Sequence, residues 1–169
     1  VLTVAAQAGV EVGTENAWRM CDERGLPRLV FINKMDRENA DFTRALQSVE
    51  DAFGSLCVAI QVPIGAQQDF KGVVSLLNLP SDVPDAVASE VERLRERLIE
   101  AVAESDDDLA TKYLEGEELS QEEVIFALKK GVIEGQIVPV MVGSASTNLG
   151  VTELMDAIVD LLPSAADLP

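Results

Sequence analysis

The stretch Leu29-Val30-Phe31-Ile32-Asn33-Lys34-Met35-Asp36 decides the fold. Its first four residues form a continuous apolar run between two loop segments, which is typical of a strand buried on both faces of a parallel sheet. Four polar or flexible residues follow at once, and open α/β sheets bind ligands outside the carboxyl ends of their strands. The stretch therefore predicts an α/β protein with a site at the end of this strand.

Strand and helix patterns alternate on both sides of this stretch. Apolar runs at residues 1–6 and 137–142 predict two further buried strands. Helical spacing of apolar residues predicts helices from Thr14, taken as the N-cap, to Cys21, and at residues 42–53 and 151–162. The pattern predicts an open parallel sheet with helices on both faces.

Residues 54–134 interrupt this alternation. The runs 56–62 and 73–79 predict a small antiparallel piece, and helices are expected from Pro84, at 106–114 and at 120–130, the last with a Ser120/Glu123 capping box. We expect residues 1–53 and 135–169 to form one unit and residues 54–134 an inserted α+β subdomain. These three segments carry net charges of −3, −10 and −4, so the acidity belongs mainly to the insert.

Composition excludes several classes of protein. The chain has 169 residues, 47% of them apolar, which argues against intrinsic disorder despite a net charge of −17. That charge repels phosphate backbones and anionic lipids, so neither nucleic-acid nor membrane binding is expected. No apolar run approaches the roughly 20 residues that cross a bilayer, and we expect a cytoplasmic monomer. The chain opens at Val1, without Met and inside a strand-like run, which suggests a fragment.

Two short motifs follow buried strands and suit the recognition of a purine. The carboxylate of Asp36 can accept hydrogen bonds from the ring N–H and the exocyclic amine of guanine, a pair of donors that adenine lacks. The stem of Lys34 can lie over the purine face, and Asn33 can brace the neighbouring loops. In Gly143-Ser144-Ala145 the small side chains let a backbone N–H approach the guanine oxygen. The alternatives are a polar turn that closes a strand and a plain strand-to-helix turn.

Residues that would hold the phosphates of a nucleotide are not recognisable. The chain contains no Gly-Lys pair and hence no phosphate loop of the GK[ST] type. The pattern DxxG begins at Asp51 and at Asp69, but neither residue ends an apolar strand, so we expect neither to contact phosphate.

These residues resemble the GTPase domain of bacterial translation elongation factor G, a P-loop GTPase. The resemblance covers nearly the whole chain and is carried by residues 25–42, which include the sequence NKMDR, and by residues 65–74, 112–119 and 143–151. It implies a GTPase that drives tRNA and mRNA through the ribosome, with GTP or GDP as ligand. It also implies guanine-site roles for Asn33, Lys34, Asp36, Ser144 and Ala145. In this family the phosphate loop, the switches and the Mg²⁺ ligands lie upstream of the position of Val1, so we expect the chain alone to be inactive.

Three departures from the family pattern favour a divergent paralogue that acts in ribosome recycling or under stress. Val12-Gly13 stands where the family usually has a Pro-Gln pair, and Ser146 stands where it usually has an aromatic residue. The stretch after Leu79 is shorter than the family often shows.

The resemblance also implies that the insert contacts the ribosomal stalk protein. Glu92, Glu96 and Glu100 recur every four residues along one helix face and could meet a basic helix there. The alternative is a solvated helix face. Two further function classes stay open. One is a stalk-docking module with a vestigial nucleotide site. The other is a different translational GTPase, such as a ribosome-protection or peptide-release factor, but the sequence NKMDR and the insert argue against it.

Overall fold

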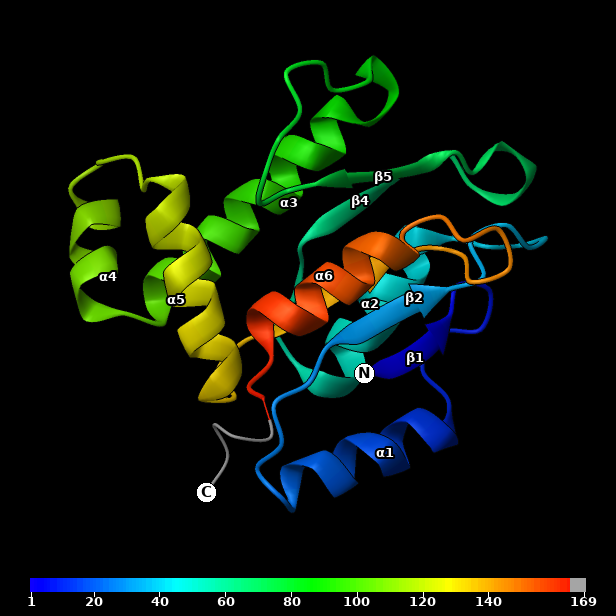
Figure 1. Ribbon diagram of the computed structural model, residues 1–169, viewed down its shortest axis with the longest axis horizontal. Coiled ribbons are helices and arrows are strands. Elements are labelled where there is room, and N and C mark those ends of the chain that lie inside the picture. Colours follow the sequence, from blue (N-terminus) through cyan, green and yellow to red (C-terminus); the bar gives the residue numbers. More distant parts are fainter. Residues whose placement is uncertain (165–169) are drawn as a thin grey trace.

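The buried apolar runs of the sequence form one parallel sheet, flanked by helices, in the computed structural model, which describes residues 1–164 (Figure 1). Its strands lie in the order β1 (Leu2–Ala5), β2 (Val30–Asn33), β6 (Val138–Val142) and β3 (Cys57–Ala59). This confirms the predicted α/β fold with an open parallel sheet. Residues 165–169, the end of the predicted segment 135–169, lie outside the described residues.

Helices cover both faces of this sheet, as predicted. α2 (Phe42–Phe53) and α6 (Val151–Leu161) lie on opposite faces (Figure 1). α1 (Val12–Asp22) contacts α2 through the rings of Trp18 and Phe53, which stack with their centroids 4.0 Å apart. The Arg28 guanidinium lies 4.2 Å from the centroid of the Trp18 ring, on which it makes a cation–π contact.

The start of α1 differs from the prediction. The N-cap is Glu11, three residues before the predicted Thr14. Thr14 lies in the first turn, where its hydroxyl accepts a hydrogen bond from the Glu11 N–H at 3.4 Å. The prediction was wrong because a threonine hydroxyl can serve either position of a capping box.

The segment between β3 and β6 forms a hairpin and three helices. β4 (Gln61–Ile64) and β5 (Gly72–Ser75) pair antiparallel around a short 3₁₀ turn, η1 (Gln67–Asp69). They are followed by α3 (Asp85–Glu104), α4 (Asp107–Leu114) and α5 (Gln121–Ile133), the last with the predicted Ser120/Glu123 capping box. Within residues 1–164, no helix combines the length and the apolar character that a membrane crossing requires.

The apolar run at residues 56–62 corrects one strand prediction. We expected the whole run in the antiparallel piece, but its first part is β3, which pairs with β6 in the parallel sheet, and only β4 pairs with β5. Ile60 lies between them and donates its N–H to Val140 O at 3.0 Å. The run holds no Gly or Pro before residue 63, so nothing in the sequence marks this division. The division into residues 1–53 with 135–169, and 54–134, stays a prediction.

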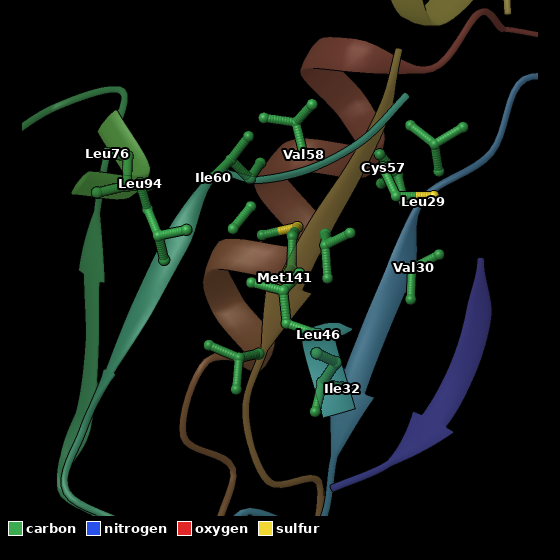
Figure 2. Packing of buried hydrophobic residues seen from close by; sticks show 14 of the residues in the cluster. Leu29, Val30, Ile32, Leu46, Cys57, Val58, Ile60, Leu76, Leu94 and Met141 are labelled. Atoms are coloured by element: carbon green, nitrogen blue, oxygen red, sulfur yellow. The ribbon is translucent and has the colours of Figure 1, made fainter. Parts of the chain in front are cut away.

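One continuous apolar core joins the segment between β3 and β6, called the insert from here on, to the parallel sheet. Figure 2 shows Leu94 of α3 and Leu76 beside Ile60, at one end of a cluster that continues through Met141 to Ile32 and Val30. Leu94 is 2% exposed. The hairpin is therefore held against the sheet by packing as well as by hydrogen bonds.

Truncation of Leu94 tests this shared core. Leu94→Ala should lower the free energy of unfolding by about 2–5 kcal/mol, because the substitution leaves a cavity between α3 and the hairpin. Urea unfolding followed by circular dichroism measures the change. Glu104→Ala, at an exposed position of the same helix, should change it by less than about 0.5 kcal/mol. Equal effects of the two substitutions would contradict a core shared by the insert and the sheet.

Candidate functional site

Parallel pairing of β2 with β6 brings the two predicted motifs together. Ile32 lies opposite Val142, and the Gly143 N–H donates to Ile32 O at 2.9 Å. The chain then leaves both strands at the same edge of the sheet, as the rule for parallel strands requires. Segments 33–36 and 143–146 therefore lie side by side although about a hundred residues separate them in the sequence.

Two serine hydroxyls hold the Asp36 carboxylate. Ser144 Oγ donates to Asp36 Oδ1 at 2.5 Å, and Ser146 Oγ donates to Asp36 Oδ2 at 2.9 Å. The hydrogen bond from Ser144 is the main cause that lowers the pKa of Asp36 below its ordinary value of 3.8, and the bond from Ser146 adds to it. Because this pKa is lowered, the carboxylate is ionised at neutral pH. The side chain of Asp36 is 19% exposed, so solvent can still reach it.

Asn33 joins the two loops. Its Oδ1 accepts hydrogen bonds from the N–H of Lys34 at 2.7 Å and from the N–H of Ala145 at 2.9 Å. We expected a backbone N–H of this loop to approach a guanine oxygen, and an oxygen bound at the Ala145 N–H would share or replace Asn33 Oδ1 as the acceptor. Lys34 is exposed and has a φ of 67°, which turns the chain sharply after the strand.

Position 143 has room only for glycine, because Leu149 and Phe31 pack closely against it. A Cβ at this position would lie 2.5 Å from Leu149 O and 2.8 Å from Phe31 Cζ, both closer than a real Cβ can approach. Ser144 is fully buried, and its N–H donates to Leu149 O at 2.8 Å. Closure of the loop before α6 therefore accounts for the glycine without any ligand.

Two residues of this site were not predicted from the sequence. Ser146 was noted only as a departure from the family pattern, yet its hydroxyl binds Asp36. The Gln61 side chain, 3% exposed, accepts a hydrogen bond through Oε1 from the Val142 N–H at 3.3 Å. A Ser-x-Ser pair after a strand was a usable signal for the first, whereas Gln61 gave none because its partner is a backbone group.

The remaining predicted residues lie elsewhere. Glu92, Glu96 and Glu100 lie at exposed positions of α3, and within residues 1–164 no hydrogen bond or ion pair joins them to segments 33–36 and 143–146. Asp51 lies late in α2 and Asp69 in η1, so neither ends a strand, as predicted for both DxxG patterns.

The arrangement suits recognition of a planar base. Each carboxylate oxygen of Asp36 accepts one serine hydroxyl and keeps a second acceptor position, so together the two oxygens can meet two adjacent N–H donors. Lys34 is exposed, and the Ala145 N–H belongs to the loop whose Ser144 and Ser146 hydroxyls bind this carboxylate. This pair of acceptor positions is the feature that a planar base with two adjacent N–H groups could use.

The α/β domain with its parallel sheet matches a known family of proteins over most of its length. The family model "Elongation factor Tu GTP binding domain" matches residues 1–164. A crystal structure of a protein from Thermus thermophilus is similar with a TM-score of 0.84 and 32% sequence identity, over 95% of this chain and 26% of that one. The chain belongs to the translational GTPase family that carries the elongation factor Tu GTP-binding domain, and this membership implies binding of a guanine nucleotide. It spans about a quarter of the Thermus protein's length.

The Ser144 hydroxyl should control the ionisation of Asp36. Ser144→Ala should raise the pKa of Asp36 toward 3.8, and Ser146→Ala should raise it less, because the Ser144 hydrogen bond is the larger cause. Carbon NMR of the side-chain carboxyl group during an acid titration measures both shifts.

The sign of the effect on stability follows from linkage. A carboxyl with a lowered pKa stabilises the folded state above its ordinary pKa, and this stabilisation is lost as the pH falls through the lowered value. Ser144→Ala should therefore flatten the stability profile in that acidic window. An unchanged Asp36 titration in Ser144→Ala would contradict the assignment.

Proposed function

We propose that the chain is the base-reading part of a GTPase of the elongation factor G type, which binds GTP or GDP and promotes translocation on the ribosome. One observation carries the proposal: the ionised Asp36 carboxylate, held by two hydroxyls, lies where two neighbouring parallel strands end. The family match and the acidic insert between β3 and β6 support it.

The chemistry of Asp36 favours guanine over other bases. Its two oxygens accept from the ring N–H and the exocyclic amine of guanine, whereas an adenine edge would leave the charged carboxylate unpaired. An unpaired ionised acceptor costs about 1–3 kcal/mol or more, which is enough to reject the wrong base. Lys34 would cover the purine face, Asn33 would hold the loops, and Ser144 would orient the carboxylate. The N–H of Ala145 would meet the guanine oxygen.

On this proposal, the described residues contact the base of the nucleotide. We propose that Mg²⁺ and the phosphate contacts are supplied by other parts of the family's domain, and that the protein works as a monomer in the cytoplasm. Ser146, at a position where the family usually has an aromatic residue, contacts Asp36 directly and supports a divergent paralogue with a role in recycling or stress.

Exchange of Asp36 for asparagine should switch the preferred base. In the full-length protein, Asp36→Asn should weaken GDP binding at least tenfold and strengthen binding of xanthosine diphosphate. The reason is that the amide donates where the carboxylate accepted, and xanthine has a carbonyl where guanine has an amine. Calorimetric titration of both nucleotides with both proteins measures the switch.

A matched control is Asp41→Asn, which removes the same charge at the N-cap of α2, outside the site. It should leave the preference for GDP unchanged. A wild-type protein that binds neither nucleotide would overturn the enzyme proposal and leave the docking function as the leading account.

A groove on the insert favours a docking function in addition. It lies along α3, with Leu79, Val83, Val91 and Ile99 in its lining and Glu92 and Glu96 beside them. Arg95 also lines it, and its guanidinium donates to Leu76 O. Glu100, one turn further, accepts a hydrogen bond from the Tyr113 hydroxyl at 3.3 Å. An apolar groove next to carboxylates suits a basic amphipathic helix, and we propose the ribosomal stalk protein as its source.

Charge reversal on this face tests the docking function. The triple substitution of Glu92, Glu96 and Glu100 by Lys should weaken stalk-protein binding about tenfold and reduce its salt dependence, because each exposed ion pair contributes up to about 1 kcal/mol. The matched control reverses Glu115, Glu117 and Glu118, which are exposed and carry the same charge. Equal affinities of the two triple variants would refute docking at α3.

A further inference from the structure

The backbone of Met35 is held from two sides. Its N–H donates to Gly143 O at 3.2 Å, and its carbonyl oxygen accepts a hydrogen bond from the Gln67 N–H at 2.7 Å. Met35 lies between Lys34 and Asp36, and its side chain is fully buried. The turn between β4 and β5 therefore fixes the residue between Lys34 and Asp36, the two side chains proposed to contact the base.

The geometry of that turn aims the Gln67 N–H at Met35. Gln67 has a φ of 56°, a left-handed conformation that residues with a side chain rarely adopt. Gly65 has a φ of 75°, and a Cβ there would lie 2.1 Å from Asp69 O, so only glycine allows the turn to close this tightly. The Lys71 N–H then donates to Ile64 O at 2.9 Å and continues the hairpin.

The other end of the same hairpin contacts the end of β6, next to segment 143–146. The Gln61 side chain on β4 accepts the Val142 N–H, immediately before Gly143. In Figure 1 the hairpin tip and the loops after β2 and β6 all lie at the same end of the molecule. The hairpin therefore contacts the backbone of Met35, within segment 33–36, and of Val142, the last residue of β6 before segment 143–146.

We propose that the β4–β5 hairpin, residues 61–75, is a positioning element of the base site and that the Gln67 backbone N–H sets the position of Asp36 through Met35. The ligand class, a guanine nucleotide, rests on the proposed function. A loop held in its bound conformation before the ligand arrives loses less conformational freedom on binding, so this contact raises affinity without touching the nucleotide. The insert then contributes to nucleotide affinity as well as offering a docking surface.

Removal of the N–H is the direct test. Gln67→Pro lacks the donor and cannot adopt a φ of 56°, whereas Ala66 before it is extended, as a residue preceding proline prefers. In the protein as its gene encodes it, Gln67→Pro should raise the Kd for GDP about three- to tenfold. Gln67→Gly keeps the N–H and accepts the positive φ, so it should retain most of the affinity. Gly65→Ala, which displaces the turn by another route, should act like Gln67→Pro.

A double-mutant cycle separates positioning from a general loss of structure. If Gln67 acts through Asp36, Gln67→Pro should change GDP affinity by less than about twofold in an Asp36→Ala background. The same three- to tenfold loss in both backgrounds would overturn the proposal, as would wild-type affinity in a folded Gln67→Pro protein.

Hydrogen exchange keeps the positioning claim testable if no nucleotide binds. Without ligand, Gln67→Pro should speed exchange of the Met35 amide at least about tenfold while the Val140 amide in β6 exchanges as in the wild type. Unchanged Met35 exchange would overturn the positioning claim. Accelerated exchange in a protein that binds no GDP would confirm the contact and overturn only the proposed function.

Discussion

The parallel pairing of β2 with β6 is the interaction on which the rest of the structure depends. Its register sets Ile32 opposite Val142, so both strands end at one level and their following loops meet. A shift by one residue would turn every side chain of a strand to the opposite face of the sheet and would separate Asp36 from Ser144. Side chains of different size fill the two buried faces of β2, Val30 and Ile32 on one and Phe31 on the other, so such a shift would also disrupt the packing of the core. The precision of the site therefore follows from the packing of the core beneath it.

The same sheet explains how the fold accommodates a long insert between β3 and β6. These two strands are neighbours in the sheet, so the insert begins and ends close to it. The entropic cost of closing a loop grows only slowly with its length, and the shared core around Ile60, Leu76 and Leu94 adds stabilising contacts. An element added at this point extends the sheet's own core, which is why the hairpin can approach the base loops without disturbing the β2–β6 pairing.

Much of the fold could be predicted from the sequence because strands buried on both faces have an unmistakable apolar pattern. The strands at residues 30–33 and 138–142 lie where that pattern predicted them, and the five expected site residues lie at their ends. Three features could not be predicted for physical reasons. The run 56–62 serves two sheets with no turn residue between them. The Ser-x-Ser pair after β6 marks Ser146 as a candidate, but its partner Asp36 is fixed only when two distant loops meet. The Gln67 N–H is a backbone donor, and backbone groups are identical in every residue except proline.

Neutral hydroxyl groups, and not a cation, hold the Asp36 carboxylate in place. An arginine bound bidentately to Asp36 would orient the carboxylate, but it would also occupy the acceptor positions that a base needs. Ser144 and Ser146 orient the carboxylate with neutral donors, and Arg37, with its Nε 3.6 Å from Oδ2, is too distant for a hydrogen bond. The carboxylate thus stays fixed, ionised and able to accept from two further donors, which is the state that base recognition requires.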